Sequence, residues 1–313
     1  MKTAVIIPTH LRPDLLERLL ADLSRAALAP ETEVHVVENG LRSGAQEICG
    51  NYPLGGRMRD HYLAEGRKSV ALNHAIDGCD ADLLIFFDDD IRVPGNIVEI
   101  YEDAARRRGP GHFFGGPLTT DADFSCPPDL APYLPLSATG WLPSNREMVM
   151  DPEAFDYFFG ANWAAFRVDL AAAGLFASDL GITASRLSPL GEENEIQERL
   201  VRAGVKPVYL PGALIRHHVP RECYTTSWVR RRRFRLGVTD WARKESAEQQ
   251  HCRKLFGVPA WLLRAVFMRR MKAFAAAVLG RARQTDIVMR DAYLSGMLHG
   301  AWVERRRQAG GSD

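Results

Sequence analysis

Three consecutive aspartates, Asp88-Asp89-Asp90, directly follow an apolar run at residues 83–87. Adjacent carboxylates repel one another unless a cation neutralises them, and Mg2+ and Mn2+ both prefer oxygen ligands that they often share with a diphosphate. Alternate side chains of an extended segment point the same way, so Asp88 and Asp90 can act together with Asp89 as their neighbour. Capping of a helix ahead of Pro94 would use one aspartate rather than three. The triplet therefore predicts a metal site.

A second acidic cluster opens a predicted helix, in the sequence Gly-Glu-Glu-Asn-Glu at residues 191–195. On a helical wheel Glu193 shares a face with Ile196 and Leu200, whereas Glu192 lies well to one side. Because the apolar face turns inward, Glu193 is expected to point into the interior or a cleft. An ionised carboxylate there could take the proton of an acceptor hydroxyl. The alternative is that these acids only complement the positive end of the helix dipole.

Two adjacent histidines, His217 and His218, end the last predicted strand. A single histidine is more often structural than a ligand. In a chain that already carries an acidic cation site, however, a pair at a strand end favours metal coordination.

The sequence Gly160-Ala161-Asn162-Trp163 places two small residues before an amide and an indole. Such a segment suits a wall on which a sugar stacks against the ring and bonds to the amide. The indole could equally belong to the core, so both interpretations of Trp163 stay open.

The densest basic run extends from Arg230 to Arg235, interrupted by one phenylalanine, and follows Trp228. It could clamp a diphosphate, hold acidic lipid head groups or bind nucleic acid, or it could simply form a solvated helix face. Apolar residues then recur at helical spacing over residues 263–278, with basic residues largely opposite. This segment could lie on a membrane surface, but packing against the catalytic domain is the preferred interpretation.

Strand and helix patterns alternate through the first half of the chain. Strands are predicted at residues 4–7, 34–37 and 83–87, and helices start at Pro13, Ser69 and Pro94. This alternation is typical of a Rossmann-like α/β fold, with a mostly parallel mixed sheet flanked by helices. Ligands of such sheets bind beyond the carboxyl ends of the strands, which is where the aspartate triplet would lie.

The second half divides into irregular and helical parts. Residues 119–151 predict long loops, residues 192–203 a helix, and residues 207–210 and 214–216 strands. From Trp228 on, the composition turns helical and basic. We therefore expect a catalytic domain at 1–225, with a nucleotide-binding half to about residue 92 and an acceptor half beyond it, and a basic helical extension at 226–313.

Composition is that of a globular protein with a substantial core, because the 313 residues are 46% hydrophobic and 25% charged. The net charge of +1 confines any basic site to a local patch. The five cysteines include no C-x-x-C pair, which favours a reducing, cytoplasmic setting. No apolar stretch reaches the length of a membrane span, and the first one is too short for a secretory signal. Peripheral contact with the inner face of a membrane stays open.

Taken together, these motifs resemble inverting glycosyltransferases of family 2, which have the GT-A fold. The resemblance runs from about Thr3 to Gly237 and lies in the order of six motifs. They are Val-Ile-Ile-Pro-Thr at 5–9, Val-Val-Glu-Asn-Gly at 36–40, Phe-Phe-Asp-Asp-Asp at 86–90, Gly-Ala-Asn at 160–162, Gly-Glu-Glu at 191–193 and Pro-Gly-Ala-Leu-Ile-Arg-His-His-Val at 211–219. The resemblance implies a metal-dependent, hexosyltransferase-type enzyme that uses a nucleotide-sugar, a UDP-sugar above all.

The family pattern also implies roles for residues at matching positions. Glu193 would be the general base, Asp88 and Asp90 would be the acidic positions of the D-x-D motif, and His217 would complete the metal site, with His218 as the fallback. Donor binding is implied for Pro8, Thr9, Arg12, Glu38, Asn73, Asp88 and Asp89. Acceptor contacts are implied for Gly160, Asn162, Trp163 and Glu192.

Two positions depart from the family pattern. Glu38 stands where an aspartate is usual, which keeps an acceptor for a base N–H on a longer arm. Leu72 stands where many members carry arginine. A diphosphate contact is therefore expected to have moved to one of four other basic residues, namely Arg67, Lys68, Arg232 and Arg233.

The acceptor is less defined than the donor. The basic C-terminal helices favour a lipid-linked or cell-envelope glycan, while a glycolipid, a peptide or a small molecule such as a secondary metabolite stays open. Nucleic acid is not an expected partner. The alternatives are a sugar nucleotidyltransferase, or an inactive protein of the same fold that binds membrane or nucleic acid through its basic C-terminus.

Overall fold

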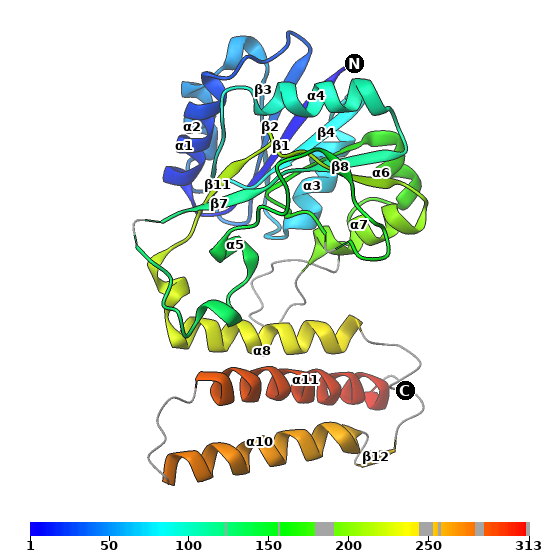
Figure 1. The fold of residues 1–313 in the computed structure, drawn as a ribbon. Coiled ribbons are helices and arrows are strands. Elements are labelled where there is room, and N and C mark those ends of the chain that lie inside the picture. Colours follow the sequence, from blue (N-terminus) through cyan, green and yellow to red (C-terminus); the bar gives the residue numbers. More distant parts are fainter. Residues whose placement is uncertain are drawn as a thin grey trace. The chain divides into compact units, whose positions relative to one another are not determined.

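The computed structural model describes residues 1–122, 124–155, 157–178, 191–243, 253–255, 258–278 and 285–310. The chain divides into two compact units. The first unit contains residues 1–122 and the described residues between 136 and 219, and the second contains residues 124–135 and the described residues from Pro220 onward (Figure 1).

An eight-stranded sheet forms the centre of the first unit. In chain order its strands are β1 (Thr3–Thr9), β2 (Thr32–Asn39), β3 (Met58–Leu63), β4 (Leu83–Phe87), β6 (His112–Gly115), β8 (Met148–Val149), β9 (Asn162–Phe166) and β10 (Lys206–Tyr209). They lie in the order β3-β2-β1-β4-β9-β6-β10-β8. Strand β9 is antiparallel to β4 and β6, and β8 is antiparallel to β10, while the other pairs are parallel.

Helices cover both faces of this sheet. One apolar cluster joins the sheet to α1 (Pro13–Ser24), α2 (Ala45–Asn51) and α4 (Ile97–Arg108). A second cluster joins the opposite face to α3 (Lys68–Asp77), α6 (Arg167–Ala173) and α7 (Glu192–Arg202). In α1, Leu16, Leu19, Leu20 and Leu23 repeat at three- and four-residue spacing, so they form one fully buried stripe. The mixed α/β fold predicted from the sequence is confirmed.

A small three-stranded sheet brings the segment after β4 next to a distant part of the chain. Its strands are β5 (Ile91–Arg92), β11 (Ile215–His218) and β7 (Leu118–Asp121), with β11 in the middle. His217 pairs in register with Ile91, and the backbone N–H of His218 donates to the carbonyl oxygen of Asp90 at 2.8 Å. The histidine pair is thereby held beside the aspartate triplet.

Shorter elements lie between and after these. They are η1 (Leu54–Gly56), η2 (Ala131–Tyr133), α5 (Leu136–Thr139), η3 (Arg221–Tyr224), β12 (Lys254–Leu255) and β13 (Val258–Pro259). Residues 119–151, predicted as loops, thus contain part of β7, a 3-10 turn, a short helix and β8, with irregular backbone between them.

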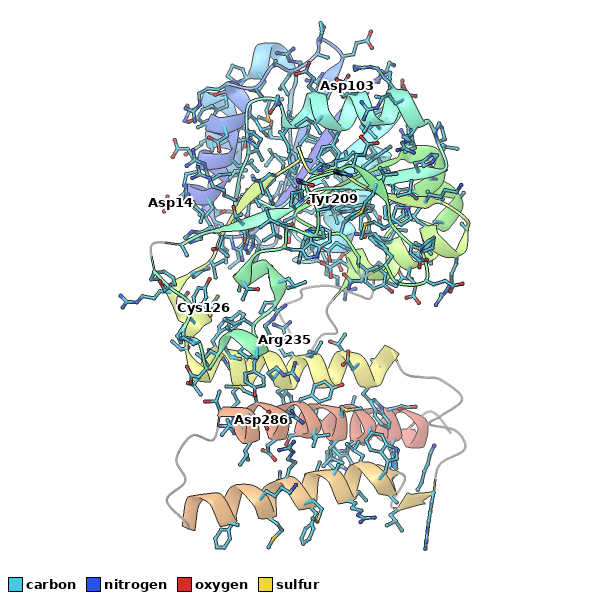
Figure 2. All side chains as sticks on the ribbon, viewed as in Figure 1. Asp14, Asp103, Cys126, Tyr209, Arg235 and Asp286 are labelled. Carbon is cyan, nitrogen blue, oxygen red and sulfur yellow. The ribbon has the colours of Figure 1, made fainter. Side chains whose placement is uncertain are left out.

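The described residues of the second unit include three long helices, as the composition predicted. They are α8 (Thr226–Arg243), α10 (Ala260–Val278) and α11 (Thr285–Gly310). Arg235 lies on α8, and Asp286 lies at the start of α11 (Figure 2). The Tyr133 hydroxyl donates to Asp286 Oδ1 at 2.9 Å, which ties residues 124–135 to these helices.

Helices α8 and α11 pack backbone to backbone. A Cβ atom on Gly237 would overlap the carbonyl oxygen of Tyr293, and one on Gly296 would overlap that of Phe234. Glycine at these two positions is therefore what allows the close approach. Among the described residues, no helix combines the length and apolarity that a membrane span needs.

Candidate active site

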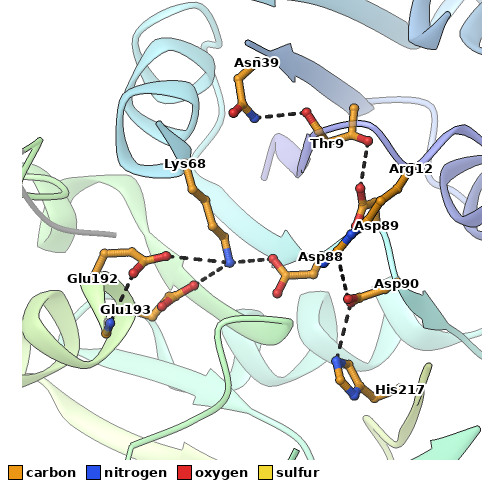
Figure 3. A network of polar contacts seen from close by, with 11 residues as sticks. Thr9, Arg12, Asn39, Lys68, Asp88, Asp89, Asp90, Glu192, Glu193 and His217 are labelled. Carbon is orange, nitrogen blue, oxygen red and sulfur yellow. Dashed lines mark hydrogen bonds and ion pairs between the residues drawn. The ribbon is translucent and has the colours of Figure 1, made fainter. Parts of the chain in front are cut away.

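A continuous network of charged side chains forms where β1 and β4 end (Figure 3). The aspartate triplet follows β4, Lys68 opens α3, the two glutamates open α7 and His217 lies on β11. Because β1 and β4 are parallel neighbours, their carboxyl ends meet at one edge of the sheet. The network therefore occupies the edge where the sequence placed the ligand site.

Lys68 is the centre of one half of the network. Its Nζ lies 2.6 Å from Asp88 Oδ1, 2.5 Å from Glu193 Oε1 and 4.0 Å from Glu192 Oε1. Burial opposes the charge of Lys68, but the three carboxylates outweigh burial and hold its pKa well above the usual value. Burial would likewise raise the pKa of Asp88, yet Lys68 holds it below the usual value. Lys68 therefore stays an ammonium that ties the triplet to the glutamates.

Asp89 turns away from Lys68 and is held by the end of β1. Thr9 donates its hydroxyl to Asp89 Oδ2 at 2.7 Å, and Arg12 Nη1 donates to Asp89 Oδ1 at 3.1 Å and to Asp90 Oδ2 at 2.7 Å. Burial raises the pKa of Asp89 to about 6 against the opposing effect of Arg12. With Asp89 held in this way, Asp88 is turned toward Lys68 and Asp90 toward His217 (Figure 3).

Asp90 and His217 present a pair of groups that suits a divalent cation. Asp90 Oδ1 is buried, accepts no hydrogen bond from the described residues, and lies 3.5 Å from His217 Nε2. His217 Nδ1 donates to the carbonyl oxygen of Ser137 at 2.9 Å, which leaves the lone pair of a neutral ring on Nε2. No three His, Cys, Asp or Glu side chains of the described residues are grouped as a complete metal site. One or two protein ligands are what Mg2+ sites shared with a phosphate use.

Both glutamates at the start of α7 reach the network, contrary to the expectation for Glu192. Its side chain is 3% exposed, whereas that of Glu193 is 12% exposed. Glu192 is the first residue of the helix, and its Oε2 turns back to accept the N–H of Gly191 at 3.2 Å. The helical wheel fails here because a first-turn side chain can fold back over the helix end. Glu193 lies where the wheel predicted.

The environment of Glu192 predicts a pH-dependent cost to folding. Burial, reinforced by the charge of Glu193, raises the pKa of Glu192 from 4.5 to about 7. Between these two values the folded state holds a proton that the unfolded state releases, so stability falls as the pH rises from 4.5 to 7. We expect Glu192→Gln to raise the free energy of unfolding at pH 8 by up to about 3 kcal/mol. The gain should vanish at pH 4.5, and thermal melts that showed one constant difference at both pH values would contradict this assignment.

Gly160, an expected acceptor-site residue, touches Glu193. A Cβ atom at Gly160 would overlap the carboxylate and Cγ of Glu193, which form the flexible end of a side chain. Glu193 can move away, so we expect Gly160→Ala to keep the fold and to lower turnover about tenfold or more by displacing this group. Gly50→Ala is the matched control, because a Cβ atom there meets nothing within 4 Å. Equal turnover of the two variants would show that the placement of Glu193 is unimportant.

Several expected donor-binding residues are engaged by the chain itself. Glu38 Oε1 accepts bonds from the N–H and the hydroxyl of Ser43, which holds the loop after β2. The side-chain amide of Asn73 donates to and accepts from the backbone of Phe176, at 2.8 and 3.0 Å. Arg67 pairs with Glu65 at 3.0 Å. Four residues were expected to contact the diphosphate. Of the two that lie in the first unit, Lys68 belongs to the network and Arg67 pairs with Glu65 instead. Arg232 and Arg233 belong to α8 in the second unit.

Two expected acceptor contacts are structural instead. Trp163 is fully buried and its ring stacks on Phe86, with ring centroids 4.6 Å apart, so the alternative interpretation of Trp163 as a core residue is the correct one. Asn162 is also fully buried: its Oδ1 accepts from the Tyr101 hydroxyl at 2.7 Å, and its Nδ2 donates to two backbone carbonyls. Both lie on β9, between β4 and β6, and neither side chain is exposed in this structure. The carbonyl of Ser137, which orients His217, carries no signal in the sequence because any residue supplies one.

Comparisons with known proteins show the fold and a family match over the first part of the chain. Residues 4–125 match the model of glycosyl transferase family 2. None of the curated proteins compared with the sequence matches it. The fold resembles that of the mannosyltransferase PcManGT from Pyrobaculum calidifontis, solved with GDP-Man and Mn2+, with a TM-score of 0.57 and 18% identity over 97% of this chain and 88% of that one.

A second similar structure is S. aureus TarS, residues 1–349, solved with UDP-GlcNAc. Its TM-score is 0.55, with 13% identity over 99% of this chain and 92% of that one. In a longer TarS structure the match covers 55% of that chain. The family match includes β1, β2, β4 and the aspartate triplet. Residues 4–125 are thus similar to glycosyl transferase family 2, and the chain has the GT-A fold of both structures.

Proposed function

We propose that the chain transfers a sugar from a nucleotide-diphosphate donor, foremost a UDP-sugar, to an acceptor hydroxyl with inversion at the anomeric carbon. The observation that carries the proposal is the position of Lys68, which contacts Asp88 and Glu193 at 2.6 and 2.5 Å. It brings the acidic triplet and the candidate base into one network, although they lie far apart in the sequence.

The proposed reaction is a single in-line displacement. Glu193 accepts the proton of the acceptor hydroxyl while the hydroxyl oxygen bonds to the anomeric carbon. The bond from that carbon to the diphosphate oxygen breaks, and the nucleoside diphosphate leaves with the bonding electrons. A positioned base contributes about 10²–10⁴-fold in rate.

Lys68 and Arg12 provide the positive charge that the departing diphosphate requires. Both are paired with carboxylates, Lys68 with Asp88 and Glu193 and Arg12 with Asp89 and Asp90. The anionic oxygens of a bound diphosphate compete with Glu193 for Lys68. The ion pair between Lys68 and Glu193 then weakens, and Glu193 becomes free to take a proton. Donor binding would thus prepare the base for catalysis.

Asp90 and His217 are the residues that we assign to a divalent cation, Mn2+ or Mg2+, with Asp88 as the further carboxylate of the motif. Asp90 Oδ1 and His217 Nε2 would supply the protein ligands, since His217 Nδ1 is already bonded to the carbonyl oxygen of Ser137. When bound, such a cation neutralises charge on the diphosphate as it leaves.

The donor class rests on the family match over residues 4–125 and is supported by two structures of the same fold, one solved with GDP-Man and the other with UDP-GlcNAc. The uracil preference is our extension, based on Glu38 at the position where the family has an acidic residue for the base. Because Glu38 Oε1 already holds Ser43, we assign it to shaping the loop around the base. A cytoplasmic setting, a glycan or lipid-linked acceptor and contact with a membrane stay predictions.

Product analysis separates this proposal from a sugar nucleotidyltransferase. A transferase releases a nucleoside diphosphate from the donor, and its release should require Mn2+ or Mg2+ and fall in Glu193→Gln. A nucleotidyltransferase instead releases pyrophosphate from a nucleoside triphosphate and a sugar phosphate. Anion-exchange chromatography of the two incubations distinguishes the products, and pyrophosphate release would overturn the proposal.

A further inference from the structure

A cavity of about 1040 Å³ lies within the second unit, apart from every residue of the network described above. Its wall comes mainly from α8, with further residues from α10 and α11. The lining residues are Ser227, Trp228, Arg230, Arg231, Arg232, Phe234, Arg235, Arg270, Asp291, Ala292 and Ser295. This arginine pocket is large enough for a small-molecule ligand.

Helical geometry explains why so many arginines share one wall. Trp228, Arg231, Arg232 and Arg235 are three, four and seven residues apart, so they lie along one face of α8. On the next helix, Gly296 lets the backbone of α11 approach α8 closely, directly after the lining residue Ser295. Most of the pocket wall therefore comes from two helices in tight contact, α8 and α11, with Arg270 of α10 added.

Positive charge in the arginine pocket exceeds the negative charge that its described lining supplies. Five arginines and one aspartate line it. The aspartate, Asp291, lies 3.9 Å from Arg270, and within the described part of the chain none of the other four arginines has a carboxylate at ion-pair distance. Burial lowers the pKa of Arg232, aided by the charge of Arg235, and burial lowers the pKa of Arg235 as well. The Nε of Arg235 is buried and has no hydrogen-bond partner among the described residues.

Guanidinium groups that are partly removed from water and lack an ion-pair partner destabilise the folded protein unless an anion binds to them. Their planar forks match the oxygens of a phosphate group, often through two parallel hydrogen bonds. The Arg232 guanidinium also lies over the Trp228 ring, 5.6 Å from its centre, which orients the fork beside an aromatic surface. Because the lining carries four net positive charges, a ligand with several phosphate groups fits better than a single phosphate.

We propose that the arginine pocket binds a ligand that carries two or more phosphate groups, held by Arg231, Arg232 and Arg235. The ligand could be a phosphorylated soluble molecule or the head groups of anionic lipids, since both present the same chemistry. Phe267 and Phe274 are both exposed on α10 and could enter a lipid surface. Lipid head groups are therefore one possible source of the phosphate groups. No residue of the active-site network lines the pocket.

Calorimetric titration of the full chain with inorganic tripolyphosphate, at two salt concentrations and without divalent metal, tests the site. We expect binding that weakens with salt and that is at least tenfold weaker in Arg232→Gln/Arg235→Gln. The matched control, Arg264→Gln/Lys272→Gln, removes two exposed charges of α10 outside the pocket and should change affinity less than twofold. Equal losses in both double variants, or no binding by the native chain, would overturn the proposal.

A second variant covers the case in which the double pocket variant fails to fold. The single change Arg231→Gln, at an exposed lining residue, should still weaken tripolyphosphate binding severalfold.

Sedimentation with phosphatidylglycerol vesicles, compared with phosphatidylcholine vesicles, shows whether the phosphate groups come from a lipid or from a soluble ligand. Loss of vesicle binding in the pocket variant supports lipid head groups, and tripolyphosphate binding that depends on the pocket without vesicle binding supports a soluble ligand. The proposed function is tested separately on Glu193→Gln and Asp90→Asn, which lie outside the pocket, so failure here is distinguishable from failure of the proposed function.

Discussion

Glu193→Gln is expected to reduce sugar transfer by about 10²–10⁴-fold while the chain still binds its donor. The amide keeps the shape of the side chain but cannot accept the acceptor's proton. Its neutral oxygen can still contact Lys68, whose Nζ lies 2.5 Å from Glu193 Oε1 in the native chain, so the fold should be retained. Turnover of nucleotide-sugar with acceptor, together with donor affinity by calorimetry, measures the two effects separately.

The matched control for this variant lies on the same helix. Glu198 of α7 is exposed and pairs with Arg202 one turn away, so Glu198→Gln makes the same chemical change outside the network. Its turnover should equal that of the native chain. Near-normal transfer by Glu193→Gln would remove Glu193 as the base, whereas equal losses of donor binding and turnover would give it a binding role instead.

Asp90→Asn is expected to raise the Mn2+ concentration needed for half-maximal donor binding by about 10–100-fold. The change removes the charge of the partly buried carboxylate that lies 3.5 Å from His217. His217→Gln should shift the same curve in the same direction, because it removes the other proposed ligand. Donor binding titrated against Mn2+ provides the measurement.

Asp103→Asn is the control for charge alone, since Asp103 is exposed on α4 and pairs with Arg106 at 2.7 Å. It should leave the Mn2+ dependence unchanged. If Asp90→Asn bound the donor with native Mn2+ dependence, the cation would have to be held elsewhere, and the assignment of Asp90 and His217 would be wrong.

The sequence predicted those parts of the fold that depend on local pattern. The β4 strand and the buried stripe of α1 were readable because their apolar spacing matches one kind of element. Strand β3 was not, because its residues Met58–Leu63 are mostly polar and only partly buried, as is usual for an edge strand. Likewise, nothing local in residues 124–135 shows that they group with the C-terminal helices.

The candidate site shows the same division between local and long-range information. Glu193 could be placed by helical periodicity, and His217 by its position at a strand end. The central role of Lys68 could not, because it depends on contacts with residues 20 and 125 positions away in the sequence. Asn162 and Trp163 looked like a sugar-binding wall because polar and aromatic residues serve cores and binding sites alike. Only burial distinguishes a core residue from a sugar-binding residue here. The burial of Asn162 and Trp163 depends on where β9 lies in the strand order of the sheet.

A thermal-shift panel of UDP-, GDP- and dTDP-sugars, each with and without Mn2+, tests most directly whether this chain uses a nucleotide-sugar. We expect at least one donor to raise the melting temperature in the presence of Mn2+, with UDP-sugars giving the largest shift, and this shift to shrink in Asp90→Asn. No shift with any donor, with or without Mn2+, would contradict the proposal that the network of Lys68, Asp88, Asp90, Glu193 and His217 is the active site of a nucleotide-sugar glycosyltransferase.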